Sequence, residues 1–310
     1  MKTLIVDPLA ARFGELVEQN NYQQYFLTNG FQPEEIEIAV VKTFTRVDEG
    51  FLQKYPNLKL IIRAGSGYDN IDLEATRSRN VIVCNTPDAN VIAAFEHTIS
   101  LILALLKGHR PGMRNLEEKT WKEGLPRNWE ISDLRVLIVG VGRIGNRVAG
   151  FLQRMGAEVR GVDPYLTQEE WQQKRVKEIT YQKGIKWCNL ISYHCPLTTE
   201  TKNYFNKQTL QSLIQPVWLI NTARGGIINE EVLLQGLQEG KILGAGLDVF
   251  VNEPQPELPY RNFENIYLTP HTGAFTNKAQ HRLAEEIIHI WEAFVFHKRI
   301  INEVKSYAER

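Results

Sequence analysis

The chain has 310 residues, 43% of them hydrophobic, so it is long enough for two domains with substantial cores. Its 36 basic and 36 acidic residues cancel, which gives no indication of a nucleic-acid partner or of binding to a membrane surface. The three cysteines, Cys84, Cys188 and Cys195, lack CxxC spacing. This argues against a zinc site and a disulfide framework, so we expect no metal. The apolar patch at the N-terminus is too short for a signal peptide, and we expect a cytoplasmic protein.

Short apolar runs separated by polar segments predict an α/β layer structure at the start of the chain. The runs cover residues 3–7, 36–41, 58–63 and 81–84, and a mainly polar helix is expected over 13–25. Strands that alternate with helices form parallel sheets. The pattern is typical of a flavodoxin-like domain.

Residues 91–106 are apolar almost throughout, with interruptions at Glu96, His97, Thr98 and Ser100. A membrane helix and a buried helix both fit such a run. A bilayer span needs ~20 apolar residues and tolerates few ionisable ones, so we expect a buried helix between two domains and no membrane. The polar segment 107–133 follows as a connector.

Residues 134–163 are predicted to form a strand, a glycine turn, a helix and a second strand. The glycines, Gly140, Gly142 and Gly145, permit a tight turn, room for a pyrophosphate, and close packing of the helix on the sheet. The helix N-terminus then favours an anion, to which Arg143 adds a charge-assisted contact. Asp163 can accept both ribose hydroxyls of adenosine and would repel a 2′-phosphate, which favours NAD over NADP. The alternatives are a glycine turn in another α/β protein or an S-adenosylmethionine pocket.

Further apolar runs complete six strands of a dinucleotide-binding fold; they cover residues 190–194, 217–221, 244–249 and 266–269. The last helix, 278–297, places one apolar stripe on its surface, made of Leu283, Ile287, Ile290, Trp291 and Phe294. We expect this helix to return to the first domain. The predicted architecture is an α/β Rossmann dinucleotide-binding domain, residues 99–287, inserted into a discontinuous flavodoxin-like substrate domain of residues 1–98 and 288–310.

Polar residues follow three of the predicted strands, where ligands of open α/β sheets bind. Hydride transfer to a 2-keto acid needs a cation for the carboxylate or carbonyl, and a proton donor near the oxygen. Arg224 and His271 supply these residue types. Glu253 can accept a hydrogen bond from the far imidazole nitrogen, which would hold the ring and raise its pKa. A loop arginine that bridges carbonyls, a surface glutamate and a core histidine are the structural alternatives.

These motifs resemble those of the D-isomer-specific 2-hydroxyacid dehydrogenases. The resemblance rests on GVGRIG with Asp163, HCPLTTET from His194, NTARGG from Asn221, LDVFVNEP from Leu247 and TPHTGA from Thr269. It implies that His271 is the acid/base, Glu253 its partner and Arg224 the carboxylate anchor. It implies a homodimer formed through residues 99–133. It also implies an NAD site made of Thr86, Gly140, Gly142, Arg143, Ile144, Gly145, Asp163, Cys195, Thr222, Ala223, Arg224, Asp248, His271, Gly273 and Ala274.

Within that family, RAGSGYDNID and CNTPDAN in the first domain most resemble the phosphoglycerate dehydrogenases. Backbone N–H groups of the glycine turn can point together at a carboxylate, and an arginine can bind a terminal phosphate bidentately. A glycine turn with a structural arginine is the alternative. The candidate substrate contacts are Arg63, Gly65, Ser66, Gly67 and Asn90.

The leading hypothesis is NAD-dependent oxidation of 3-phospho-D-glycerate to 3-phosphohydroxypyruvate, a step of serine biosynthesis. The alternatives are a glyoxylate or hydroxypyruvate reductase, another D-2-hydroxyacid dehydrogenase and, from a different class, an NAD-sensing corepressor-like binding protein. Ser78 and Phe275 depart from the family pattern, which commonly has a basic residue and a small serine there. The chain ends soon after the last helix, so the resemblance predicts no serine-binding regulatory domain.

Overall fold

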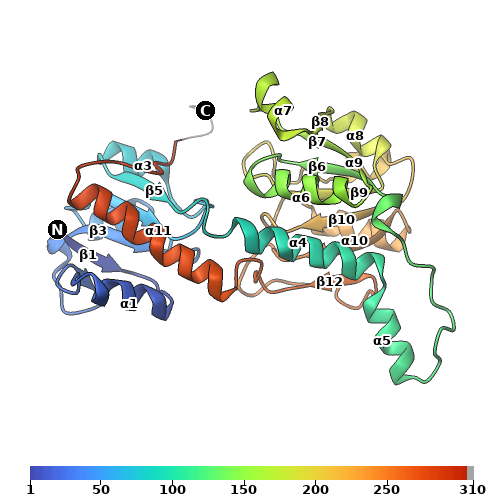
Figure 1. The fold of residues 1–310 in the computed structure, drawn as a ribbon, viewed down its shortest axis with the longest axis horizontal. Coiled ribbons are helices and arrows are strands. Elements are labelled where there is room, and N and C mark those ends of the chain that lie inside the picture. The colour runs from blue at the N-terminus through green and yellow to red at the C-terminus, as the bar shows by residue number, and fades with distance from the viewer. Residues whose placement is uncertain (306–310) are drawn as a thin grey trace. The chain divides into compact units, whose positions relative to one another are not determined.

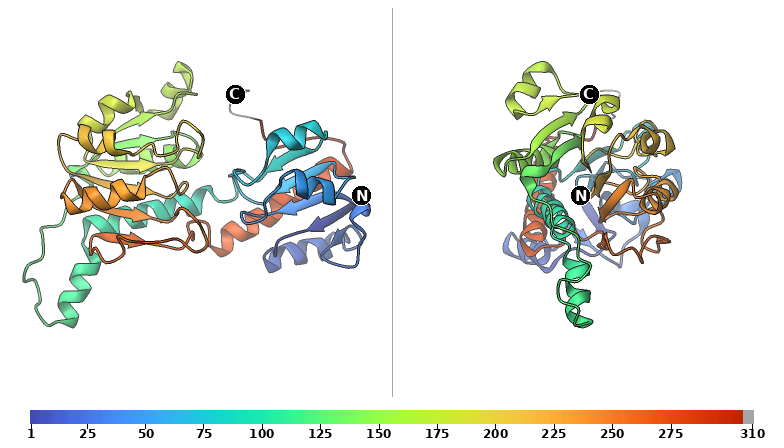
Figure 2. Two further views of the ribbon diagram at one scale, coloured as in Figure 1. Left: turned by 180° about the vertical axis from the view of Figure 1, so that it is seen from behind. Right: turned by 90° about the vertical axis from the view of Figure 1, so that its right-hand side faces the viewer.

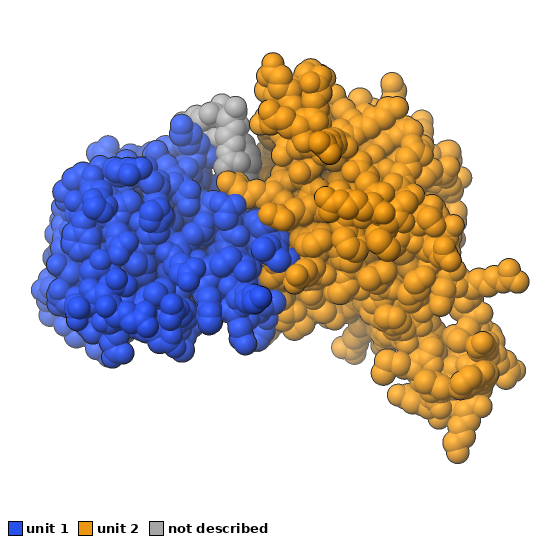
Figure 3. All heavy atoms as spheres, in the orientation of Figure 1, with its two compact units in different colours: residues 1–92, 274–310 blue, residues 93–273 orange. Residues whose placement is uncertain are grey.

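The computed structural model describes residues 1–305, which form two compact units (Figure 1, Figure 3). Unit 1 comprises Met1–Ile92 and the segment that begins at Ala274, and unit 2 comprises Ala93–Gly273. Each unit contains one sheet whose neighbouring strands all pair in parallel. Parallel pairing requires crossovers, and helices provide most of them in both units; residues 248–265, which connect β11 to β12, contain no helix.

Unit 1 has a five-stranded sheet with the order β2-β1-β3-β4-β5, which is the flavodoxin-like order. Its strands are β1 (Lys2–Ile5), β2 (Phe26–Leu27), β3 (Ile36–Val41), β4 (Leu60–Arg63) and β5 (Ile82–Asn85). Its helices are α1 (Ala11–Gln19), η1 (Pro33–Glu35), α2 (Glu49–Lys54), α3 (Leu73–Ser78) and α11 (Asn277–Val295). The predicted flavodoxin-like fold is therefore confirmed.

The whole of α11 belongs to unit 1. Leu283 and Ile287 pack in one apolar core with Phe13 of α1 and with Ile62 of β4. Trp291 is fully buried and its Nε1–H donates to Thr3 Oγ1 at 2.8 Å. The compact units therefore divide at 273/274, whereas the sequence placed this boundary at 287/288. Four residues of the predicted stripe lie in this core, and the fifth, Phe294, packs against it.

Unit 2 has a seven-stranded sheet with the order β12-β11-β10-β9-β6-β7-β8. Its strands are β6 (Arg135–Val139), β7 (Glu158–Val162), β8 (Lys177–Glu178), β9 (Leu190–Tyr193), β10 (Val217–Asn221), β11 (Ile242–Leu247) and β12 (Ile266–Leu268). This is the Rossmann order with one strand added at the β12 edge. The predicted fold is confirmed, but the prediction of six strands was wrong. It missed β8, which has only two residues, both charged and exposed.

Helices cover both faces of the unit 2 sheet (Figure 2). One core joins the sheet to α8 (Tyr181–Trp187), α9 (Lys207–Ser212) and α10 (Glu230–Gln238). The opposite core joins it to α4 (Val91–Leu106), α6 (Arg143–Arg154) and α7 (Gln168–Lys174). The remaining helices are α5 (His109–Glu117) and η2 (Ile131–Asp133).

Most of α4 packs against unit 2. Ile102 and Leu105 lie in the core that α4 shares with α6, and the units divide at 92/93 rather than at the predicted 98/99. The reason is that His97 and Thr98, placed in the first domain from the sequence, make hydrogen bonds to unit 2 residues. Across residues 1–305, no single helix is long and apolar enough to cross a membrane. Helices α4 and α5 pass that test only as a pair bent by 53°.

Candidate active site

The glycine turn between β6 and α6 has the backbone that its sequence predicts. Gly140 has φ +91°, and a Cβ on Gly145 would lie 2.0 Å from the Gly140 carbonyl oxygen. Gly142 is the N-cap of α6, and a Cβ added there would have nothing within 4 Å. The turn thus leaves open space at a helix N-terminus, which is the environment that a pyrophosphate requires.

Asp163 follows β7 and lies beside this turn. Its Oδ2 accepts a hydrogen bond from Val141 N at 2.9 Å, and its Oδ1 accepts one from Tyr165 N at 3.2 Å. The carboxylate therefore helps to order the glycine turn. Ribose binding by Asp163 stays a prediction.

The loop after β9 lies against the same turn. A Cβ on Gly140 would be 2.7 Å from the backbone N of Cys195. Burial raises the pKa of the Cys195 thiol to about 12, so this side chain is not a reactive thiolate. The backbone of Cys195, which the sequence assigned to the cofactor site, adjoins the turn; its contact with the cofactor stays a prediction.

His271 and Glu253 form a close pair. His271 Nδ1 lies 2.6 Å from Glu253 Oε2, while Glu253 Oε1 accepts a hydrogen bond from Phe250 N at 2.9 Å. Burial raises the pKa of Glu253, but the hydrogen bonds from His271 and Phe250 and the charges of His271 and Arg224 outweigh it, so the net shift is downward. The carboxylate stays ionised at neutral pH and can stabilise an imidazolium. Because Nδ1 is engaged, Nε2 is the ring nitrogen that can exchange a proton with a substrate.

Arg224 lies on the loop that follows β10. Asn221 shapes this loop, because its side chain donates to Arg224 O at 2.9 Å and accepts from Ala223 N at 3.1 Å. The guanidinium donates to Ala223 O at 2.6 Å, and its charge lowers the pKa of Glu253. The structure therefore brings together the three residues that the sequence predicted as catalytic, from loops after three different strands.

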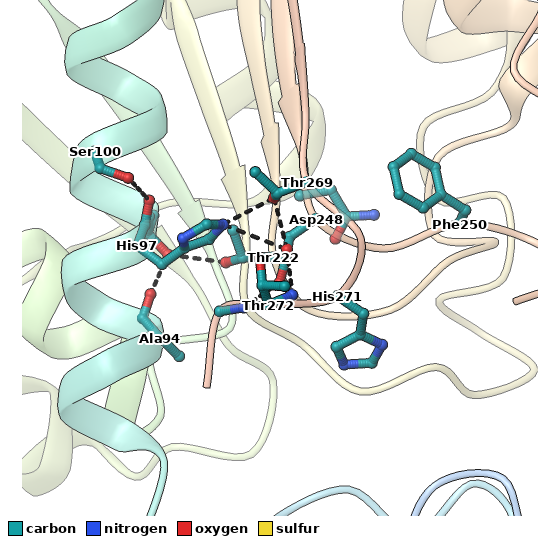
Figure 4. Close-up of polar contacts among 12 residues, drawn as sticks. Ala94, His97, Ser100, Thr222, Asp248, Phe250, Thr269, His271 and Thr272 are labelled. Carbon is teal, nitrogen blue, oxygen red and sulfur yellow. Dashed lines mark hydrogen bonds and ion pairs between the residues drawn. The ribbon is translucent and has the colours of Figure 1, made fainter. Parts of the chain in front are cut away.

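Asp248 holds the loop that carries His271 (Figure 4). Its side chain is 2% exposed, and its carboxylate accepts hydrogen bonds from Thr269 Oγ1 at 2.6 Å and from Thr272 N and Gly273 N at 2.8 Å each. Burial raises the pKa of Asp248, but these bonds and one from His97 outweigh it and lower the pKa overall. A direct cofactor contact of Asp248, which the sequence suggested, stays a prediction.

The predicted substrate residues gather at the carboxyl edge of the unit 1 sheet. Gly65 has φ +132°, and its N–H donates to Thr86 Oγ1 at 2.6 Å. Arg63 is 5% exposed and donates to Ala64 O and to Thr43 Oγ1, each at 3.0 Å. A Cβ on Gly65 would lie 1.9 Å from Arg63 Nη1 and 3.8 Å from Asn90 Nδ2. The guanidinium is therefore packed against the glycine turn, and Thr86, predicted as a cofactor contact, is bonded to the same turn.

Sequence reasoning missed Lys42 at this edge. Lys42 follows β3 directly, its Nζ donates to Pro8 O at 2.8 Å, and its backbone N donates to Asp7 Oδ2 at 2.6 Å. Burial lowers the pKa of Lys42, the Arg63 charge lowers it further, and Asp7 opposes this. The signal was present, since Lys42 is a polar residue directly after a predicted strand.

A family model described as D-isomer specific 2-hydroxyacid dehydrogenase, NAD binding domain, matches residues 99–273. The chain belongs to this family. Residues 99–273 of this dehydrogenase family member therefore form an NAD-binding domain, in agreement with the cofactor predicted from the glycine unit.

Curated relatives of this dehydrogenase family member include the D-3-phosphoglycerate dehydrogenase of Bacillus subtilis, 36% identical over 251 residues, which are 81% of this chain and 48% of the relative. That of Archaeoglobus fulgidus is 32% identical over 302 residues, 94% of this chain and 57% of the relative. The chain spans about half the length of these proteins.

Two solved structures have a similar fold. D-lactate dehydrogenase from Aquifex aeolicus, complexed with NAD and lactic acid, has a TM-score of 0.85 and 25% identity, with 95% of each chain covered. A glyoxylate reductase from Paecilomyes thermophila has a TM-score of 0.87 at 21% identity, covering 100% of this chain and 99% of that one. The latter likeness concerns the fold alone.

Proposed function

We propose that this protein is an NAD-dependent dehydrogenase that oxidises a D-2-hydroxy acid, with 3-phospho-D-glycerate as the leading substrate. The observation that carries the proposal is the 2.6 Å pair of His271 Nδ1 and Glu253 Oε2 beside Arg224, in the unit whose glycine turn suits a dinucleotide. An imidazole held by an ionised carboxylate can exchange a proton with the substrate, and a guanidinium nearby can bind the substrate carboxylate.

In the proposed reaction, His271 removes the proton of the substrate hydroxyl through Nε2 as the hydride leaves C2. NAD, when bound, accepts that hydride. Glu253 stabilises the imidazolium that results, and Arg224 holds the substrate carboxylate. In the reverse direction His271 returns the proton to the oxygen that gains charge. General acid/base groups of this kind contribute about 10²- to 10⁴-fold to the rate.

The glycine turn of unit 1 supplies the proposed substrate contacts. Backbone N–H groups around Ser66 and Gly67 can bind a carboxylate, and Asn90 can contact a hydroxyl. Arg63 and Lys42 add positive charge at this edge, which suits a substrate with a second anionic group such as a phosphate. The identity of the relatives as phosphoglycerate dehydrogenases supports this choice.

A substrate panel tests the proposal. Purified protein is assayed with NAD and 3-phospho-D-glycerate, D-glycerate or D-lactate, and with NADH and the corresponding keto acids or glyoxylate. We expect the phosphorylated pair to have the highest kcat/KM, and His271→Asn to lose turnover while binding NADH as before. Equal efficiency with and without the phosphate would favour a glyoxylate or hydroxypyruvate reductase. NADH binding without turnover of any acid would favour the corepressor-like alternative.

We also propose that the protein is a homodimer of the cytoplasm. The segment around α5 exposes Met113, Leu116 and Trp121, whose exposed fractions are 62%, 61% and 69%. Large apolar side chains exposed in one segment are typical of an interface. The three free cysteines fit a reducing compartment. Light scattering of the purified protein should give twice the mass of 35.6 kDa; a monomeric mass would refute the dimer.

A further inference from the structure

The backbone of His271 has a conformation that must be held in place. Its φ is +52°, in the left-handed region that a non-glycine residue adopts only when its surroundings impose it. His271 N donates to Asp248 O at 2.9 Å and to Thr269 O at 3.0 Å. The position of the imidazole thus depends on how firmly the loop 269–273 is fixed to Asp248.

His97 of α4 lies next to the Asp248 carboxylate and the Thr269 hydroxyl (Figure 4). His97 Nε2 lies 2.9 Å from Thr269 Oγ1 and 3.3 Å from Asp248 Oδ1. The Thr269 hydroxyl donates its proton to Asp248 Oδ1 at 2.6 Å, so toward His97 it can only accept. Nε2 of His97 therefore carries the proton and donates it to both oxygens.

The next residue of α4 reaches a second loop of the site. Thr98 Oγ1 lies 2.8 Å from Thr222 Oγ1, beside the loop that carries Arg224, and also donates to Ala94 O at 2.7 Å. Thr98 is fully buried, and the His97 side chain is 19% exposed. Two consecutive residues of α4 are thus hydrogen-bonded to residues that directly follow β10, β11 and β12.

We propose that His97 is a positioning residue for hydride transfer, acting through Thr269 and Asp248 to fix the loop that holds the His271 imidazole. The inference rests on the proposed dehydrogenase function. Loss of the Nε2–H donor leaves the Thr269 hydroxyl and one Asp248 oxygen short of a hydrogen bond in a buried place. The loop then samples other positions, in which the imidazole no longer meets the substrate oxygen.

This role predicts an effect on turnover rather than on substrate affinity. Misplacement of a catalytic group by about 1 Å costs up to ~10²-fold in rate, so His97→Phe should lower kcat by about 10- to 100-fold. KM for the keto acid should change little, because the hydrogen bonds of His97 run to Thr269 and Asp248 and not to Arg224, the proposed carboxylate anchor. His97→Gln places an amide N–H near the former Nε2 position and should restore most of the activity.

The control variant is Ser100→Ala on the same helix. Ser100 Oγ donates to His97 O at 2.7 Å, so this change perturbs the helix around His97 without touching the Asp248 carboxylate. We expect Ser100→Ala to keep the kcat of the unchanged protein. Thr269→Val removes the hydroxyl that joins the two side chains and should reproduce the His97→Phe effect. The double variant His97→Phe/Thr269→Val should lose little more than either single one, because both break the same connection.

Amide hydrogen exchange gives a readout that does not require activity. Exchange at His271, Thr272 and Gly273 should be faster in His97→Phe than in Ser100→Ala, since weakened contacts permit local opening. An unchanged kcat and unchanged exchange in His97→Phe would overturn the inference, as would a His97→Gln variant as impaired as His97→Phe. If the unchanged protein turns over no acid in the panel, the proposed function fails, and the exchange data alone decide whether His97 holds the loop.

Discussion

Gly225 lies where the loop that carries Arg224 packs against the loop that carries Glu253. A Cβ at this position would lie 1.9 Å from the Phe250 carbonyl oxygen and 2.1 Å from the carbonyl carbon. Both atoms are backbone, so no side-chain rotation can relieve the clash. Because non-bonded heavy atoms pack at about 3.5 Å, Gly225→Ala must separate the two loops by about 1.5 Å.

The expected consequence is a loss of turnover. A displacement of about 1 Å in a catalytic constellation costs up to ~10²-fold, so kcat/KM for the preferred acid should fall by about 10²-fold or more, which corresponds to about 2.7 kcal/mol of transition-state stabilisation. NADH affinity should fall much less, because the glycine turn at Gly140 belongs to β6 and α6 and is not displaced.

Steady-state oxidation of NADH and fluorescence titration with NADH measure these two quantities. Gly150→Ala is the matched control, since a Cβ at Gly150 meets nothing within 4 Å and alanine in a helix is favoured by about 0.5–1 kcal/mol over glycine. The control should be fully active and as stable or more so. A Gly225→Ala variant with unchanged kcat/KM would refute the claim that close packing of these loops positions the two side chains.

Three further predictions address the cofactor, the acid/base pair and pH. Asp163→Ser should lower the preference for NADH over NADPH, measured as a ratio of kcat/KM values, by about 10-fold or more, because a carboxylate no longer repels the 2′-phosphate. Glu253→Gln should lower kcat by roughly 10²-fold with KM little changed, because an amide cannot stabilise the imidazolium of His271. Burial lowers the pKa of His194 from 6.5 to about 3. Between pH 6.5 and pH 3 the imidazole is therefore protonated in the unfolded chain but neutral in the folded one, so the free energy of unfolding decreases as the pH falls. At about pH 5 the loss is about 2 kcal/mol, and urea unfolding of His194→Gln should show a smaller difference between about pH 7 and pH 5.

The features that sequence predicted well are those with a local signal. The β6 strand, the glycine turn and the first turn of α6 are encoded within a dozen consecutive residues, and Asp163 follows the next strand directly. Arg224, Glu253 and His271 were selected in the same way, as polar residues after apolar runs; the structure places them on loops after three strands, and their catalytic roles stay a prediction. A parallel sheet brings the carboxyl ends of its strands to one edge, so residues distant in the chain meet there without any pairwise signal.

The features that sequence missed depend on contacts between distant segments. Strand β8 has no apolar residue and exists because Lys177 and Glu178 pair with Arg160 and Gly161 of β7. The boundary at 273/274 depends on the core against which the apolar stripe of α11 packs. The periodicity of the sequence shows that a stripe exists but does not identify that core. His97 looked like an interruption of an apolar helix. Its hydrogen-bond partners, Thr269 and Asp248, follow β12 and β11, far along the chain.

The strand register explains why these partners meet His97 together. Asn221 of β10 pairs with Leu247 of β11, which pairs in turn with Leu268 of β12. The residues that follow, Thr222, Asp248 and Thr269, therefore form one row across the sheet. Because side chains of a strand alternate between faces, a slip of β12 by one residue would turn Thr269 to the opposite face and remove it from the Asp248 carboxylate. The position of the His271 imidazole thus depends on the register of an edge strand, and in our proposal His97 holds that edge from a separate helix.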